Sequence, residues 1–258
     1  MRTDDTTEDL RAALARRDEE IAGLRSQLEG HERDAAERAR QLERYAADLR
    51  ETFKQERARA QELKASYRST VRALANAVEA RDAYTGRHAE RVAAYGLEIA
   101  IAAGLDLGRS PEMEFGFLLH DVGKVAVPDA ILFKTTALTA EEYALIARHP
   151  VIGWEILRDI EFLGDAKLVV RHHHERWDGT GYPDGLAGDA IPLAARVFAV
   201  ADTLDALTSD RPYRPAVGWA AARAEVRAAS ATQFDPAVVA AFESVPDERF
   251  AHIRERVG

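Results

Sequence analysis

The stretch A-A-R-V-F-A-V-A-D-T-L-D-A-L, residues 194–207, decides the fold class of this 258-residue chain. Its length and almost continuous apolar character predict a helix that is buried in a protein core. Asp202 lies within the stretch, where burial of a carboxylate is costly unless a cation or a metal ion pairs with it. We therefore expect a core helix that carries a charge with a dedicated partner.

The sequence on both sides of this stretch is also helical in pattern. Ser110-Pro111 is typical of a helix start that leads into His120, and Thr139 with Glu142 matches a capping box. Two further helices are predicted over residues 219–229 and 236–242. Because few segments alternate apolar and polar residues as strands do, the fold is predicted to be all-α.

The N-terminal part of the chain has the pattern of a long coiled coil. One series of apolar positions is spaced by seven residues: Leu14, Ile21, Leu28, Ala35, Leu42 and Leu49. Its companion positions are Leu10, Leu24 and Tyr45, and a second series, offset by four residues, is Phe53, Ala60, Tyr67 and Leu74. This pattern predicts a coiled-coil helix that forms a homodimer. A solvated single helix is the alternative, because Arg17, His31 and Arg38 occupy heptad positions where the interface between two chains favours apolar residues.

Three segments are therefore expected. Residues 1–67 form the coiled-coil helix, residues 68–245 form a globular helical domain, and residues 246–258 form a charged C-terminal tail.

Composition excludes several classes of protein. The net charge of −9 argues against coating of a nucleic-acid polymer, although a small anionic substrate needs only a local positive pocket. The chain has no cysteine, so a metal ion must be held by histidine and carboxylate. The N-terminus lacks the apolar run of a signal peptide, and the apolar stretch over residues 92–105 is too short to cross a bilayer. A cytoplasmic protein without membrane contact is expected.

Five of the eight histidines are candidate ligands in the predicted globular domain: His88, His120, His149, His173 and His174. Each has a simpler explanation when taken alone: a single histidine on a helix is more often a surface or core residue than a ligand. Several histidines and aspartates on helices of a chain without cysteine nevertheless favour a divalent ion such as iron or manganese.

A set of motifs, in order along the chain, resembles the HD-GYP family, a branch of the HD phosphohydrolases. The matching runs are residues 78–85 (V-E-A-R-D-A-Y-T) with His88, residues 119–124 (L-H-D-V-G-K), His149-Pro150, residues 173–183 (H-H-E-R-W-D-G-T-G-Y-P), Ala201-Asp202 and residues 209–214 (S-D-R-P-Y-R). They lie within residues 74–242, about two thirds of the chain. The resemblance implies an HD-domain helical bundle after the coiled coil.

The resemblance implies two divalent metal ions, iron or manganese. The ligands of the first would be His88, His120, Asp121 and Asp202, and those of the second would be Asp121, His149, His173 and His174, so that Asp121 bridges the two ions. Consecutive histidines diverge by about 100° on a regular helix, so His173 and His174 both need to lie near a helix end.

Neighbouring positions refine this expectation. His172 is interpreted as a bystander to the metal centre. Family members that bind three metal ions carry glutamate at the position of Tyr84, which favours a two-metal centre here.

The resemblance also implies an activity. Members of the family are phosphodiesterases that hydrolyse cyclic di-GMP to linear pGpG, and in some cases to GMP. It assigns Asp121 and Lys124 to catalysis, with Lys124 on the scissile phosphate, and Lys124, Arg211 and Arg214 to substrate binding. Surface ion pairing is the alternative for the two arginines. Another cyclic dinucleotide or nucleotide, or a non-catalytic scaffold, are the alternative functions.

The loop Gly181-Tyr182-Pro183 has the composition of a turn. The resemblance implies that an exposed Tyr182 binds a GGDEF-domain partner. A purely structural loop is the alternative.

Overall fold

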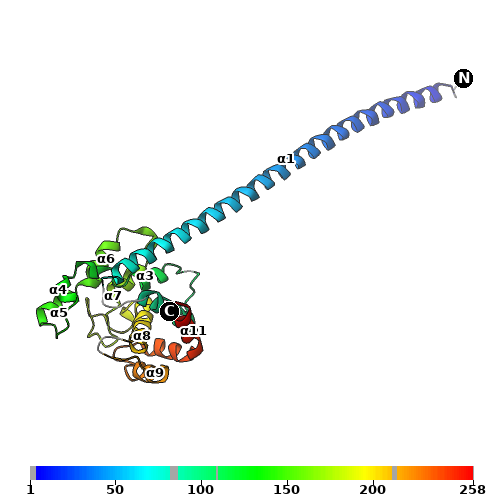
Figure 1. Ribbon diagram of the computed structural model, residues 1–258. Coiled ribbons are helices and arrows are strands. Elements are labelled where there is room, and N and C mark those ends of the chain that lie inside the picture. Colours follow the sequence, from blue (N-terminus) through cyan, green and yellow to red (C-terminus); the bar gives the residue numbers. More distant parts are fainter. Residues whose placement is uncertain (1–3, 82–86, 109, 211–213, 258) are drawn as a thin grey trace. The chain divides into compact units, whose positions relative to one another are not determined.

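The computed structural model describes residues 4–81, 87–108, 110–210 and 214–257 (Figure 1). Within these ranges the chain is helical and contains isolated β-bridges but no strand. The predicted all-α fold is therefore confirmed. The chain divides into two compact units, residues 1–65 and residues 66–258.

The first unit is the greater part of helix α1 (Asp4–Glu79). Its apolar heptad side chains are exposed in the single chain, at 57% for Leu14, 58% for Leu28 and 69% for Leu49. The helix itself is as predicted from the heptad spacing. No helix in the described part of the chain is both long enough and apolar enough to cross a membrane.

The second unit begins with the last turns of α1. Val71, Ala75 and Val78 are buried there, at the i, i+4 and i+7 spacing of one helix face. The helices that follow are α2 (His88–Ala102), α3 (Met113–Leu119), α4 (Asp129–Leu132), α5 (Ala140–Ile146), α6 (His149–Leu157), α7 (Ala166–His172), α8 (Leu193–Thr208), α9 (Trp219–Ala228), α10 (Pro236–Ser244) and α11 (Asp247–Val257). Three 3-10 segments are η1 (Val122–Ala126), η2 (Glu161–Leu163) and η3 (Gly188–Ala190).

Helix α8 is the centre of the core, as its apolar sequence predicts. Val197, Phe198, Val200, Ala201 and Leu204 are completely buried. Helix α2 packs along α8, and α7, α9 and α10 also contact it. Asp202 therefore lies on a helix whose position is set by apolar packing on several sides.

The C-terminal segment differs from the prediction of a charged tail. Residues 247–257 form α11, which packs against α2 and buries Phe250 and Ile253. The ring of Phe250 lies edge-on to Tyr95, with 5.5 Å between ring centroids, and stacks near Trp219. The prediction was wrong because it followed the overall composition, in which charged residues are in the majority. Phe250 and Ile253, which are three residues apart, nevertheless form a buried helix face.

Candidate metal centre

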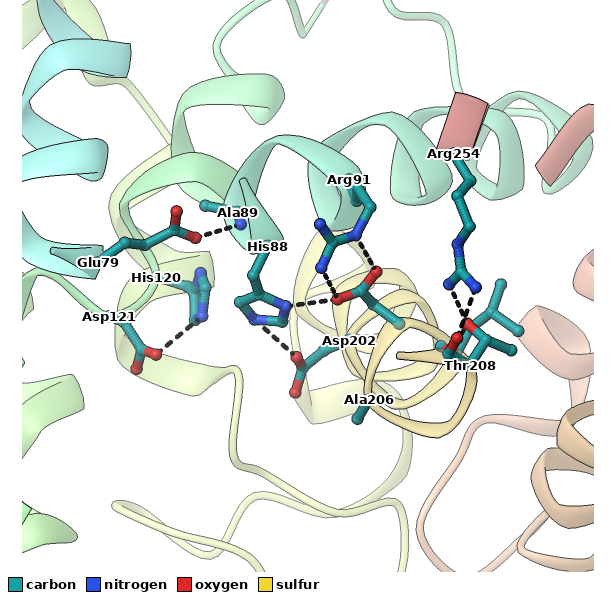
Figure 2. Close-up of polar contacts among 12 residues, drawn as sticks. Glu79, His88, Ala89, Arg91, His120, Asp121, Asp202, Ala206, Thr208 and Arg254 are labelled. Atoms are coloured by element: carbon teal, nitrogen blue, oxygen red, sulfur yellow. Dashed lines mark hydrogen bonds and ion pairs between the residues drawn. The ribbon is translucent and has the colours of Figure 1, made fainter. Parts of the chain in front are cut away.

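Five elements bring the predicted metal ligands together. His88 is the first residue of α2, and His149 is the first residue of α6. His120 and Asp121 follow the end of α3, and Asp202 comes from α8. Figure 2 shows His88, His120, Asp121 and Asp202 facing one another across this junction.

The last two predicted ligands, His173 and His174, follow the end of α7 at His172. Their imidazole centroids are 4.2 Å apart, and both rings contact the ring of His149. Ligand atoms of these three histidines lie within 4.8 Å of one another. The expectation that consecutive histidines ligate only where a helix ends agrees with this geometry.

Asp121 lies between the two predicted ligand sets. Its Oδ2 is 3.1 Å from His120 Nε2, while its Oδ1 is 3.1 Å from His149 Nε2 and 3.9 Å from His173 Nε2. Each carboxylate oxygen therefore faces a different group of imidazoles. This is the arrangement that a carboxylate needs in order to bridge two ions.

Backbone carbonyls determine how three of the imidazoles face the centre. Nδ1 of His120, His149 and His173 lies 2.8–2.9 Å from the carbonyl oxygen of the residue three positions earlier. Because a carbonyl only accepts, each Nδ1 carries the proton and each Nε2 presents a lone pair to the centre. The Nε2 atoms of His149 and His173 are only 3.1 Å apart, and two lone pairs at that distance repel unless a cation binds them. The donor set thus fits a metal ion.

Burial keeps His173 and His174 neutral. Burial, together with the neighbouring His174 and His149, holds the pKa of His173 well below its usual value. Burial and then His149 lower the pKa of His174 to about 4. Both rings are therefore neutral near pH 7, which is the form that binds metal ions.

The first group contains a charge network around His88 (Figure 2). His88 Nε2 is 3.3 Å from Asp202 Oδ1, and His88 Nδ1 is 2.7 Å from Asp205 Oδ2. Burial opposes a charge on His88, but the hydrogen bonds to Asp202 and Asp205 outweigh burial and raise its pKa to about 10. The two carboxylates therefore favour a positive charge beside them, which is a proton on His88 or a divalent ion that replaces it.

Asp205 and Arg91 support the candidate centre through contacts that the sequence interpretation missed. The Asp205 side chain is 2% exposed and receives two hydrogen bonds from Arg91, at 2.7 and 3.0 Å, besides that from His88. A carboxylate on the distal nitrogen of a metal-binding imidazole fixes the orientation of the ring and raises its basicity. Asp205 lies three residues after Asp202 in the same apolar stretch, so the argument used for Asp202 applied to it as well.

We expect Asp205→Asn to weaken metal binding at the His88 position by roughly 10- to 100-fold. Asparagine keeps the size of the side chain but removes the charge that faces His88 and Arg91. Competition with a chelator would show one ion released at lower chelator concentration, while the ion at His149 stays bound. Asp159→Asn, at a carboxylate that is 89% exposed, is the control. Equal weakening of both ions would contradict a local role for Asp205.

Lys124 lies beside the carboxylate of Asp121. Lys124 belongs to segment η1, and its Nζ is 2.7 Å from Asp121 Oδ2. The adjacent Gly123 permits this placement, since a Cβ there would lie 2.0 Å from the carbonyl oxygen of His149. Only glycine therefore lets η1 approach α6 closely enough to join Asp121 and His149.

A second polar cluster ties the loop over residues 179–186 to the end of α7. The buried Glu175 accepts hydrogen bonds from the backbone N–H groups of Asp184 and Leu186, at 2.8 and 3.0 Å. Arg171 donates two hydrogen bonds to Asp184, and His172 Nδ1 lies 3.6–3.7 Å from both carboxylates. Because these carboxylates already accept hydrogen bonds from the protein, we interpret the cluster as a structural contact between the loop and α7. The sequence interpretation did not identify it.

The remaining predicted residues are placed as follows. The Tyr182 ring is half-buried and stacks on His174, with 4.7 Å between centroids, so it faces the metal centre; a GGDEF-domain partner there stays a prediction. Arg214 is exposed and donates a hydrogen bond to the carbonyl oxygen of Ala206 at the end of α8. Arg211 and Tyr84 lie outside the described residues.

Comparison with known proteins agrees with this geometry. Residues 72–238 match the HD-domain family. The chain is 44% identical over 174 residues to the cyclic di-GMP phosphodiesterase response regulator RpfG of Xanthomonas campestris, covering 67% of this chain and 46% of the relative. It is 48% identical over 165 residues to a cyclic di-GMP phosphodiesterase of Pseudomonas aeruginosa, covering 62% and 39% of the two chains.

Other relatives have a different nucleotide in their names. A 3'3'-cGAMP-specific phosphodiesterase of Vibrio cholerae is 42% identical over 168 residues, covering 64% of this chain and 32% of that protein. A crystal structure of a cyclic GMP-AMP specific phosphodiesterase from V. cholerae superimposes with a TM-score of 0.57 at 21% identity, covering 73% of this chain and 52% of the other, and shows the same fold. The chain spans less than half the length of these curated relatives.

Proposed function

Because this chain belongs to the HD-domain family, we propose that it is a metal-dependent phosphodiesterase that hydrolyses cyclic di-GMP to linear pGpG. The position of Asp121 between two groups of imidazoles is the observation that carries the proposal. Relatives at 44% and 48% identity, named cyclic di-GMP phosphodiesterases, support the choice of substrate.

Two groups of side chains would bind the two metal ions of the proposed enzyme. His88, His120, Asp121 and Asp202 would hold one divalent ion, and Asp121, His149, His173 and His174 the other. Two such ions, iron or manganese, would supply a nucleophile from water at neutral pH and would neutralise charge on the attacked phosphate. Lys124 adds a fixed positive charge beside them, which stabilises the negative charge that develops on the phosphate.

The second phosphate of a cyclic dinucleotide needs a partner outside this centre. Burial of a phosphate without a cation is costly, and guanidinium groups bind phosphate through two parallel hydrogen bonds. We assign Arg211 and Arg214 to this phosphate. The exposed guanidinium of Arg214 keeps donor capacity beyond its bond to Ala206, because arginine has five N–H groups.

Hydrolysis assays test the proposed function. The full chain should be loaded with iron under anaerobic conditions or with manganese in air, and then given cyclic di-GMP, 3'3'-cGAMP and bis(p-nitrophenyl) phosphate. We expect cyclic di-GMP to have the highest kcat/KM. Preference for 3'3'-cGAMP would favour the second candidate substrate, which the relative at 42% identity supports. Metal-loaded protein that hydrolyses neither cyclic dinucleotide would contradict the proposal.

We propose further that α1 joins two chains in a parallel coiled coil. Its exposed heptad leucines are the surface that a second copy would cover. Deletion of residues 1–65 should reduce the mass in light scattering from that of two chains to that of one. The full chain with Ile21→Asp and Leu28→Asp provides a variant that keeps its length. An unchanged oligomeric state in both would contradict the coiled-coil dimer.

A further inference from the structure

A series of aromatic rings leads outward from the metal centre. The Tyr182 ring stacks on the ring of His174, with centroids 4.7 Å apart and an angle of 24° between the planes. Tyr143 meets the ring of Tyr182 edge-on, at 6.3 Å and 76°. Tyr143 is therefore separated from a predicted metal ligand by a single ring.

Tyr143 is the member of the series with open surface. The residue is 53% exposed, whereas Tyr182 is half-buried and uses one face of its ring to cover His174. Helix α5, which carries Tyr143, has no buried residue, so core packing does not explain an aromatic side chain at this position.

The backbone beneath Tyr143 is held firmly for so exposed a helix. Thr139 and Glu142 form a capping box at the start of α5. Lys134 Nζ lies 2.8 Å from Glu142 Oε1, which ties the helix to the end of α4. An aromatic side chain on a fixed helix turn loses little conformational entropy when a flat ligand binds it.

We propose that Tyr143 is the surface on which a nucleobase of the substrate stacks, with Tyr182 holding it in place. This inference rests on the proposed function, because a phosphate at the metal centre leaves its nucleoside to extend over the neighbouring surface. Aromatic side chains bind any base through its flat face, so Tyr143 would contribute affinity for nucleotides over other phosphodiesters. Selection between guanine and adenine would come from other groups.

Two ligands that differ only by the base provide the test. Binding of guanosine 5′-monophosphate and of ribose 5-phosphate to the metal-loaded full chain would be measured by calorimetry, which does not depend on turnover. We expect Tyr143→Ala to weaken binding of the nucleotide about tenfold and to leave ribose 5-phosphate unchanged. Tyr143→Phe should keep the affinity for the nucleotide. Leu145→Ala, at a side chain on the same helix that is 44% exposed, is the matched control.

Hydrolysis kinetics give an independent measurement. Because the stacking contact would form in the ground state and the transition state alike, Tyr143→Ala should raise KM for cyclic di-GMP about tenfold and leave kcat nearly unchanged. Equal changes for both ligands, or none, would refute the stacking surface even if the wild-type chain hydrolyses cyclic di-GMP. Loss of nucleotide affinity in a chain that hydrolyses no cyclic dinucleotide would support the surface and refute the proposed substrate.

Discussion

Replacement of Asp121 by alanine should release both metal ions together and reduce hydrolysis of cyclic di-GMP by on the order of a thousandfold or more. The reason is geometric: the two carboxylate oxygens face different imidazoles, with Oδ2 toward His120 and Oδ1 toward His149, each at 3.1 Å. Metal ions contribute several kcal/mol of transition-state stabilisation, so loss of both should abolish most of the rate. Elemental analysis of the purified variant beside rate measurements would test the prediction.

A second variant distinguishes a ligand that bridges two ions from a ligand that binds one ion. His149→Ala removes an imidazole from one group only, so it should release one ion and leave the other bound at His88. If Asp121→Ala keeps one ion at full occupancy, Asp121 is not a bridge. Three tightly bound ions in the wild-type chain would contradict the two-metal centre that tyrosine at position 84 predicts.

The residues that meet at the candidate metal centre were predictable because their evidence is local in sequence. His120 with Asp121, and His173 with His174, are adjacent residues in motifs that also contain the turn residues of their helix ends. Membership of the HD-domain family, to which the family indicated by these motifs belongs, is confirmed by the match over residues 72–238. Asp202 was found by a physical argument, since a carboxylate in an apolar helix needs a positive partner.

The supporting contacts were harder to predict because they join distant segments. Arg91 and Asp205 are 114 residues apart, and no spacing rule connects them. Glu175 is adjacent to the two histidines, yet its role depends on backbone N–H groups of a loop that folds back onto it. Such contacts depend on the tertiary path of the chain, which motif spacing does not give.

Two helices show that sequence pattern and composition do not give the environment of a segment. The heptad pattern of α1 predicted its helical conformation, but a second copy of the chain would have to cover its apolar positions. The charged composition of residues 247–257 suggested a tail, whereas Phe250 and Ile253 bury one face of α11. Two apolar residues in the right register suffice, because Glu248, Arg249, Glu255 and Arg256 stay exposed. The half-buried Arg254 and Asp247 have polar partners, Thr208 and Arg223.

The charge of Lys124 is expected to act on catalysis and not on metal binding. Its Nζ lies 2.7 Å from Asp121 Oδ2, so a phosphate that reaches the metal centre would come within range of the ammonium group. Lys124→Met keeps most of the side-chain volume and removes the charge. Loss of one fixed electrostatic contact to the transition state costs about 10²- to 10³-fold in kcat. Single-turnover rates with cyclic di-GMP and elemental analysis of the same samples would measure both properties.

Lys167→Met is the control, because this lysine of α7 donates an exposed hydrogen bond to the backbone carbonyl oxygen of Arg158 and is assigned neither to the metal centre nor to the stacking surface. It should leave kcat unchanged. The alternative role for Lys124 is to hold Asp121 in position, and the two roles predict different metal contents. If Lys124→Met loses one or both ions, the lysine orients the bridging ligand. If both ions remain and kcat falls by about two to three orders of magnitude, the ammonium group stabilises charge on the phosphate itself.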